Sequence, residues 1–183
     1  LVNRQKEKGE KLEIMELEKE ISGMIPVVLN GENLNFFYRG ISDRLDKLGK
    51  TIRIIDYKNS VKDSDNFIYE GMESLFSEKR NDKQFQLFMY SWMLYRNGQD
   101  PEGMQACIIP FKSSQPGPYF VTDSEKEPLA LTNELLEEFE QKLKAFALDL
   151  FNKELFYEQT EDTELCQFCD YNTICRRNLP DER

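Results

Sequence analysis

The stretch TIRIIDYKNS, residues 51–60, is apolar through most of its length and then presents an aspartate and a lysine. Its isoleucines are typical of a buried β-strand. Because side chains alternate along a strand, Asp56 and Lys58 lie on the same face as Ile54, about 6 to 7 Å apart. Taken alone, this pattern fits an ion pair at the end of a strand. The surrounding sequence is needed to distinguish such a pair from a catalytic or metal-binding site.

A tight turn in DKLGK joins this strand to a preceding strand that carries Asp43 and Asp46. A turn centred at Leu48–Gly49 places Asp43 opposite Ile54, on the face of Asp56. A three-residue turn would reverse the parity and place Asp46 there instead. Two carboxylates at one strand end repel each other, and the usual relief is a hard divalent cation such as Mg²⁺ or Mn²⁺ bound by oxygen.

The rest of the chain predicts a mixed central β-sheet flanked by helices, in the α/β (α+β) class. Upstream, we expect a charged helix over Lys6–Ile21 and a hairpin turn at Asn30-Gly31. Downstream, the pattern predicts a helix, two strands and an amphipathic helix, in the order Lys83–Asn97, 103–111, 117–123 and Thr132–Lys153. The predicted order is therefore αβββαββα, with the strand that begins at Thr51 in the middle of the sheet.

Length and composition indicate one globular domain over residues 1–183. The net charge of −10 argues against a protein coated with phosphate-binding groups. No apolar run is long enough to suggest a membrane span, and the N-terminus lacks the apolar region of a signal peptide, so we expect a cytoplasmic protein with no membrane partner. The chain opens on Leu1 within a charged run, and we interpret it as excised from a longer polypeptide.

Residues 40–60, GISDRLDKLGKTIRIIDYKNS, and residues 83–94, KQFQLFMYSWML, together resemble the PD-(D/E)xK nucleases of the RecB type. The family pattern is G-x-x-D-R-x-D, then a strand ending in D-Y-K, then a helix with Q-x-x-x-Y. The resemblance implies a restriction-endonuclease-like core and a metal-dependent nuclease that acts on DNA.

The same resemblance assigns roles to individual residues. It implies three metal ligands, which are the side chains of Asp43 and Asp56 and the carbonyl of Tyr57. It makes Lys58 the catalytic lysine, since a lysine beside such a metal can orient or deprotonate a water and help to neutralise a pentacovalent phosphate. Two further side chains are expected to contact DNA: Arg44 and Tyr90.

The glutamine of the Q-x-x-x-Y helix has two candidates. Gln84 is followed at the fifth position by Phe88 instead of tyrosine, whereas Gln86 and Tyr90 repeat the spacing two residues later. The two glutamines are about 200° apart around a helix, so only one faces the site. We assign Gln84 as the catalytic glutamine because of its distance from D-Y-K. Family members usually carry a histidine upstream of the first aspartate, and this chain has none.

The segment 163–177 contains three cysteines in a C-x2-C-x5-C arrangement: Cys166, Cys169 and Cys175. Thiols so closely spaced in a cytoplasmic chain indicate metal or cluster binding, which needs four ligands. In the AddB branch, this triplet combines with one cysteine far upstream to hold a [4Fe-4S] cluster. The resemblance therefore implies such a cluster in the full-length protein, with Cys107 as the alternative fourth ligand.

The first hypothesis is a Mg²⁺- or Mn²⁺-dependent deoxyribonuclease domain of the RecB/AddB type, an exonuclease that processes DNA ends in double-strand break repair and recombination. Its expected partners are DNA and a helicase or motor subunit or domain. The second hypothesis is a catalytically incomplete scaffold or DNA-holding module of a repair complex, motivated by the missing histidine, Phe88 and the acidic charge. A transcription-related zinc module built on the cysteines is the third.

Overall fold

The computed structural model describes residues 11–61, 67–112, 117–156, 158–161, 163–166 and 169–177. The chain divides into two compact units, Leu1–Leu148 and Asp149–Arg183. The first unit contains the β-sheet and the helices that pack on it. The second contains the three closely spaced cysteines. A single domain over residues 1–183 stays a prediction.

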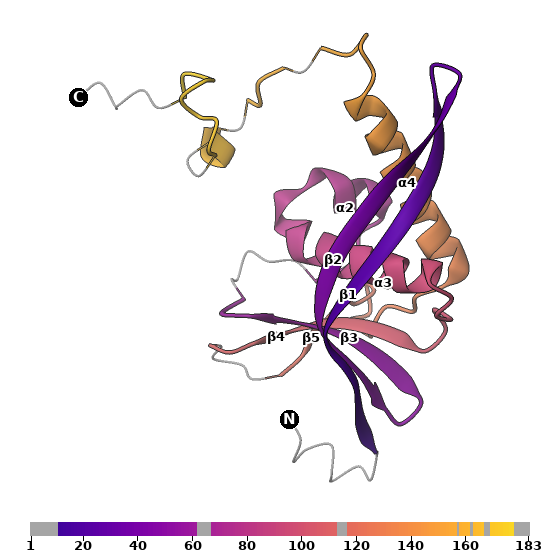
Figure 1. Ribbon diagram of the computed structural model, residues 1–183. Coiled ribbons are helices and arrows are strands. Elements are labelled where there is room, and N and C mark those ends of the chain that lie inside the picture. Colours follow the sequence, from indigo (N-terminus) through magenta and orange to yellow (C-terminus); the bar gives the residue numbers. More distant parts are fainter. Residues whose placement is uncertain are drawn as a thin grey trace, which may run out of the picture. The chain divides into compact units, whose positions relative to one another are not determined.

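A mixed five-stranded sheet forms the centre of the first unit, in the order β1-β2-β3-β4-β5 (Figure 1). Its strands are β1 (Leu12–Leu29), β2 (Glu32–Leu48), β3 (Thr51–Lys58), β4 (Met104–Pro110) and β5 (Tyr119–Phe120). The strand β3 pairs antiparallel with β2 and parallel with β4. This arrangement confirms the prediction of a mixed α+β fold with the 51–58 strand in the middle of the sheet.

The N-terminal element is a strand, and the predicted helix over Lys6–Ile21 is wrong wherever the structure describes it. Residues from Leu12 onward belong to β1, and residues 6–10 lie outside the described part of the chain. The strand β1 is at the edge of the sheet, where charged side chains are tolerated because they remain in solvent. A register shift between Ile14 and Glu16 also interrupts the alternation that would have identified a strand.

The hairpin between β1 and β2 turns at Asn30-Gly31, as predicted. Both residues have positive φ, +52° for Asn30 and +83° for Gly31, as a type I′ turn requires. Asparagine and glycine are the residues that adopt this conformation at least cost. The turn therefore follows directly from the dipeptide.

Three α-helices and two short 3₁₀ helices are present in the described part of the chain. They are α2 (Met72–Ser77), η1 (Lys79–Asn81), α3 (Asp82–Arg96), α4 (Asn133–Leu150) and η2 (Thr163–Cys166). The helices α3 and α4 confirm the two helices predicted downstream, over Lys83–Asn97 and Thr132–Lys153. The helices α2 and η1 were not predicted. No described helix is long and apolar enough to span a membrane.

The helix α3 packs closely on the β1–β2 hairpin because two glycines leave room for its aromatic side chains. A Cβ atom on Gly23 would lie 2.5 Å from Cζ3 of Trp92, and one on Gly40 would lie 2.9 Å from Cε1 of Tyr90. Neither contact is possible for a side-chain carbon without movement. The glycines thus set the distance between the hairpin and α3.

The core lies between the sheet and the helices α3 and α4. Phe88 of α3 is fully buried there, with its ring 5.4 Å from that of Tyr69 and 5.5 Å from that of Phe139. Ile54 of β3 belongs to the same cluster. Phe88, which departs from the tyrosine of the family pattern, is therefore a core residue.

Candidate active site

The register of β2 and β3 decides which upstream aspartate joins Asp56. Asp46 pairs with Arg53, and the turn lies one residue later than predicted. The ladder ends at Arg44 and Ile55, and one residue beyond it the same register aligns Asp43 with Asp56. The predicted partner of Asp43 was Ile54, so that pairing is wrong by two residues. A shift of two keeps the parity, and Asp43 remains on the face of Asp56.

Asp56 is a buried carboxylate at the end of β3, with 3% of its surface exposed. Its Oδ1 accepts a hydrogen bond of 3.1 Å from Nε2 of Gln86, and its Oδ2 lies 2.8 Å from Nζ of Lys58. Burial raises the pKa of Asp56, and the negative charge of Asp43 raises it further, while Lys58 opposes the rise. The surroundings therefore favour the neutral acid more than water does.

Asp43 is fixed by the backbone of the neighbouring strand. Its Oδ2 accepts a hydrogen bond of 2.6 Å from the backbone N–H of Tyr57. This bond joins β2 to β3 beside Asp56 and orients one of the two Asp43 oxygens. The carbonyl of Tyr57 as a third metal ligand stays a prediction.

Lys58 and Asp56 are linked through one glutamine of α3. Nζ of Lys58 donates to Oε1 of Gln86 at 2.9 Å, and Nε2 of the same amide donates to Asp56. The amide also donates to the hydroxyl of Tyr90 at 2.7 Å. Through these two hydrogen bonds, Gln86 fixes the position of the Lys58 amine relative to the Asp56 carboxylate.

The geometry favours Gln86 over Gln84, the residue that the sequence analysis assigns as the catalytic glutamine. Gln84 is buried, and its amide donates to the carbonyl of Ile68 and to Oδ1 of Asn81, each at 3.2 Å. The motif Q-x-x-x-Y is therefore occupied by Gln86 and Tyr90, which are hydrogen-bonded to each other. The tyrosine four residues after Gln86 was the signal in the sequence that could have selected it.

A second lysine near the carboxylates was missed by the sequence analysis. Lys83, Gln86 and Tyr90 are spaced by three and four residues and so share one face of α3. The side chain of Lys83 is only 16% exposed, and its positive charge opposes the rise in the pKa of Asp56. Its position three residues before Gln86 on the helix could have indicated it.

Arg44 belongs to a buried network on the other face of β3. Its guanidinium forms an ion pair with Asp46, and its Nη1 donates to the hydroxyl of Tyr57 at 3.3 Å. Arg53 also donates to Asp46, at 2.7 and 2.8 Å. The two arginines balance the carboxylate of Asp46, which is fully buried. Contacts of Arg44 and Tyr90 with DNA stay predictions.

The cysteines divide between the two units of the chain. Cys107 is buried in β4, where desolvation raises the pKa of its thiol to about 12. Cys107 as the alternative fourth ligand stays a prediction. Cys166, Cys169 and Cys175 are partly exposed in the second unit. Among the described residues, no group of three or more histidine, cysteine, aspartate or glutamate side chains is arranged to hold a metal ion.

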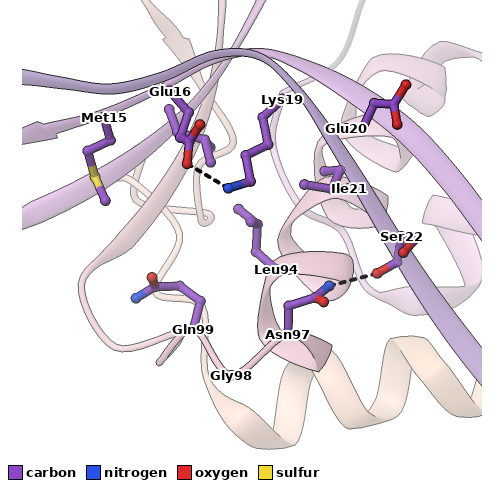
Figure 2. A pocket seen from close by; sticks show the side chains of 11 residues that line it. Met15, Glu16, Lys19, Glu20, Ile21, Ser22, Leu94, Asn97, Gly98 and Gln99 are labelled. Carbon is purple, nitrogen blue, oxygen red and sulfur yellow. Dashed lines mark hydrogen bonds and ion pairs between the residues drawn. The ribbon is translucent and has the colours of Figure 1, made fainter.

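A hollow of about 360 Å³ lies between β1 and the C-terminal end of α3 (Figure 2). Figure 2 shows an ion pair between Lys19 and Glu16, and a hydrogen bond from Asn97 to the carbonyl of Ser22. Their lengths are 2.6 Å and 2.7 Å. Its described lining residues do not include the aspartates or Lys58. The hollow is therefore separate from the carboxylates.

The carboxylates of Asp43 and Asp56 fit a hard divalent cation. Both groups offer oxygen, the ligand that such cations prefer. Oδ2 of Asp56 is buried, and within the described part of the chain its contact with Lys58 does not have hydrogen-bond geometry. This oxygen keeps the capacity to accept a further positive partner. Burial of this carboxyl group is also the largest cause of the raised pKa of Asp56, and the negative charge of Asp43 adds to it.

A comparison with protein families agrees with this chemistry. The family model described as the PD-(D/E)XK nuclease superfamily matches residues 1–176. No curated protein matches the chain. Among solved structures, the crystal structure of SSO0001 matches with 18% sequence identity and a TM-score of 0.45, over 90% of this chain and 61% of that chain. This chain thus spans less than two thirds of the length of SSO0001.

Proposed function

Because the chain belongs to the PD-(D/E)XK nuclease superfamily, we propose that Asp43, Asp56 and Lys58 form the catalytic centre of a nuclease that hydrolyses phosphodiester bonds of DNA. The observation that supports this most is the hydrogen-bonded group of Asp56, Lys58 and Gln86 beside Asp43. It combines two carboxylates for a divalent cation with an amine held at a fixed separation. The cation is Mg²⁺ or Mn²⁺.

Each side chain has a defined task in this proposal. Asp43 and Asp56 would hold the cation, which would supply Lewis-acid stabilisation of the phosphate oxygens and a more acidic water. Lys58, oriented by Gln86, donates a hydrogen bond to the attacking water or to a phosphate oxygen as negative charge develops there. Because Gln86 is held by Tyr90, these groups are positioned before substrate binds.

We further propose that the nuclease is of the RecB/AddB type and acts as an exonuclease in double-strand break repair with a helicase or motor partner. The supporting features are the order of D-R-x-D, D-Y-K, Q-x-x-x-Y and the cysteine triplet along the chain. The triplet Cys166, Cys169 and Cys175 would hold a [4Fe-4S] cluster with a fourth cysteine upstream. The proposed compartment is the cytoplasm.

One of the observations that supported the alternative, a catalytically incomplete scaffold, has another explanation. Phe88 had suggested a defective Q-x-x-x-Y motif. Gln86 and Tyr90 provide a hydrogen-bonded pair with the same spacing, and Phe88 belongs to the core. The absence of histidine is what still distinguishes this chain from the family pattern.

The test is cleavage of linear DNA by the intact protein with Mg²⁺ or Mn²⁺. We expect Lys58→Ala to lower the rate by roughly 100-fold or more, as for loss of a proton-handling group. Lys50→Ala is the matched control, because Lys50 is exposed in the turn before β3. The proposal fails if the wild type does not cleave with either metal, or if Lys58→Ala cleaves as fast as Lys50→Ala.

A further inference from the structure

One face of α3 carries a row of polar side chains that passes over two strands of the sheet. Tyr90 lies against Gly40 of β2, because a Cβ atom on Gly40 would be 2.9 Å from Cε1 of Tyr90. One turn earlier, Gln86 donates to Asp56 of β3 at 3.1 Å. Lys83 is three positions before Gln86 and is the next residue on the same face. The row therefore continues past the carboxylate of Asp56 with a lysine.

The side chain of Lys83 is held against the protein. It is only 16% exposed, although lysine is among the residue types that are least often buried. Its Nζ lies 3.7 Å from Oδ1 of Asp82, which is farther than a hydrogen bond reaches. An ammonium group has three N–H donors, so this contact does not use up its capacity to bind a phosphate oxygen. The amine is thus placed beside the site while it keeps its ability to bind an anion.

The charge of Lys83 acts on the proposed metal site. Burial raises the pKa of Asp56, and Lys83 is among the positive charges that oppose the rise. The amine of Lys58 is already engaged, since it lies 2.8 Å from Oδ2 of Asp56 and 2.9 Å from Oε1 of Gln86. The chain has a net charge of −10, so a DNA strand that approaches two carboxylates is repelled. A second lysine next to Asp56 offsets this repulsion.

We propose that Lys83 binds the phosphate next to the scissile phosphate, so that the nuclease has a second phosphate subsite one helical turn from Gln86. This inference rests on the proposed function, which places the scissile phosphate at Asp56 and Lys58. Lys83 and Gln86 are about 4.5 Å apart along the helix axis. Consecutive phosphates of one strand advance by a similar distance along a duplex, roughly 3.4 Å. No charge develops on the neighbouring phosphate during the reaction, so the contact contributes equally to binding of substrate and transition state.

Binding is tested without divalent cation, so that cleavage plays no part. Lys83→Gln keeps most of the side chain and removes its charge. We expect this variant of the intact protein to bind a short fluorescent duplex roughly threefold or more weakly than the wild type. The slope of log K against log salt should fall by about 0.9, the loss of one phosphate contact. A wild type that does not bind the duplex, or equal slopes for the wild type and Lys83→Gln, overturns the subsite.

Two further variants separate charge from position. Lys83→Arg keeps the positive charge and should retain the wild-type slope. Lys50→Gln is the matched control, because Lys50 is exposed at the opposite end of β3, roughly 20 Å from Lys58 along the strand. It should also retain the wild-type slope. An equal fall in slope for Lys50→Gln and Lys83→Gln would mean that any exposed lysine has this effect, and would overturn the subsite.

Cleavage of linear DNA provides the second readout. We expect Lys83→Gln to raise KM by roughly threefold or more with little change in kcat, as for loss of uniform binding. A structural effect through Gln86 would lower kcat instead, so a lower kcat with an unchanged KM overturns the subsite. Lys83→Arg should restore the lower KM, and Lys50→Gln should match the wild type.

The nuclease proposal and the subsite can fail independently. An unchanged KM and salt slope for Lys83→Gln in a wild type that cleaves overturn the subsite and leave the nuclease proposal standing. A reduced salt slope for Lys83→Gln in a protein that does not cleave supports the phosphate contact and overturns the nuclease proposal.

Discussion

The surroundings of Asp56 disfavour the negative charge of its carboxylate. It is buried at the end of an apolar strand with Asp43 beside it, and the single ammonium of Lys58 in direct contact does not balance both carboxylates. Burial of like charges of this kind is costly for folding and is common at functional sites. The arrangement is best explained as a site that is completed by a cation.

The raised pKa of Asp56 makes the stability of the protein depend on pH when no divalent cation is present. A carboxyl group with a folded-state pKa above its ordinary 3.8 stabilises the fold below that value and loses this contribution as the pH rises through the folded-state pKa. The wild type should therefore lose stability relative to Asp56→Asn as the pH rises. Urea unfolding of both proteins across pH 3 to 8, roughly the range that such a group titrates over, measures the difference. A difference that stays constant or changes the other way would contradict the assigned environment.

The two glutamines of α3 should behave in opposite ways when replaced. Gln86→Ala removes the bonds that orient Lys58 and Asp56, and we expect it to lower kcat by roughly tenfold or more with little effect on stability. Gln84→Ala removes buried hydrogen bonds and should cost about 1 to 3 kcal/mol of unfolding free energy.

Cleavage rates and urea unfolding curves of the same two proteins decide between these roles. Equal loss of activity in both variants, once corrected for the folded fraction, would argue against the special role of Gln86.

The sequence predicted the face shared by Asp43, Asp56 and Lys58 because strand alternation is unaffected by a register error of two. It offered Gln84 and Gln86 and led us to assign Gln84, because the face that an apolar helix turns toward the carboxylates depends on tertiary packing. Lys83 was missed for the same reason. The orientation of α3 depends on how Trp92 and Tyr90 pack against Gly23 and Gly40. No local sequence pattern encodes this packing.

Among the elements, β1 shows where local patterns mislead. Its N-terminal half is rich in glutamate, which favours helices, and its alternation is broken at the bulge after Ile14. The pairing with β2 overrides these preferences because it supplies hydrogen-bond partners along one whole side of that strand. Strong local signals, such as the Asn30-Gly31 turn and the amphipathic α4, were predicted correctly.

The packing of α3 on the hairpin should depend on Gly23. In Gly23→Ala the new methyl group would overlap the ring of Trp92, so we expect a loss of about 1 to 3 kcal/mol in unfolding free energy, typical of overpacking. Ser22→Ala is a matched control, because Ser22 is adjacent and exposed. Urea unfolding measures both variants. Equal stability of the two would mean that α3 is not held at the distance observed.

Across the first unit, the topology brings the proposed catalytic groups together. The chain leaves β3 at Lys58, passes through α2 and α3, and returns as β4, which runs parallel to β3 (Figure 1). This crossover packs one face of α3 over the end of β3, where Gln86 contacts both Asp56 and Lys58. The fold class was predictable from the order of elements, and the side-chain contacts at the crossover were not.

The most direct test of the central claim is a calorimetric titration of the 183-residue chain with Mn²⁺. The account predicts saturable binding to the wild type and to Asp100→Ala, an exposed aspartate far along the chain, and loss of binding in Asp56→Ala. Equal binding to Asp56→Ala and the wild type would contradict the assignment of the carboxylates as the metal site.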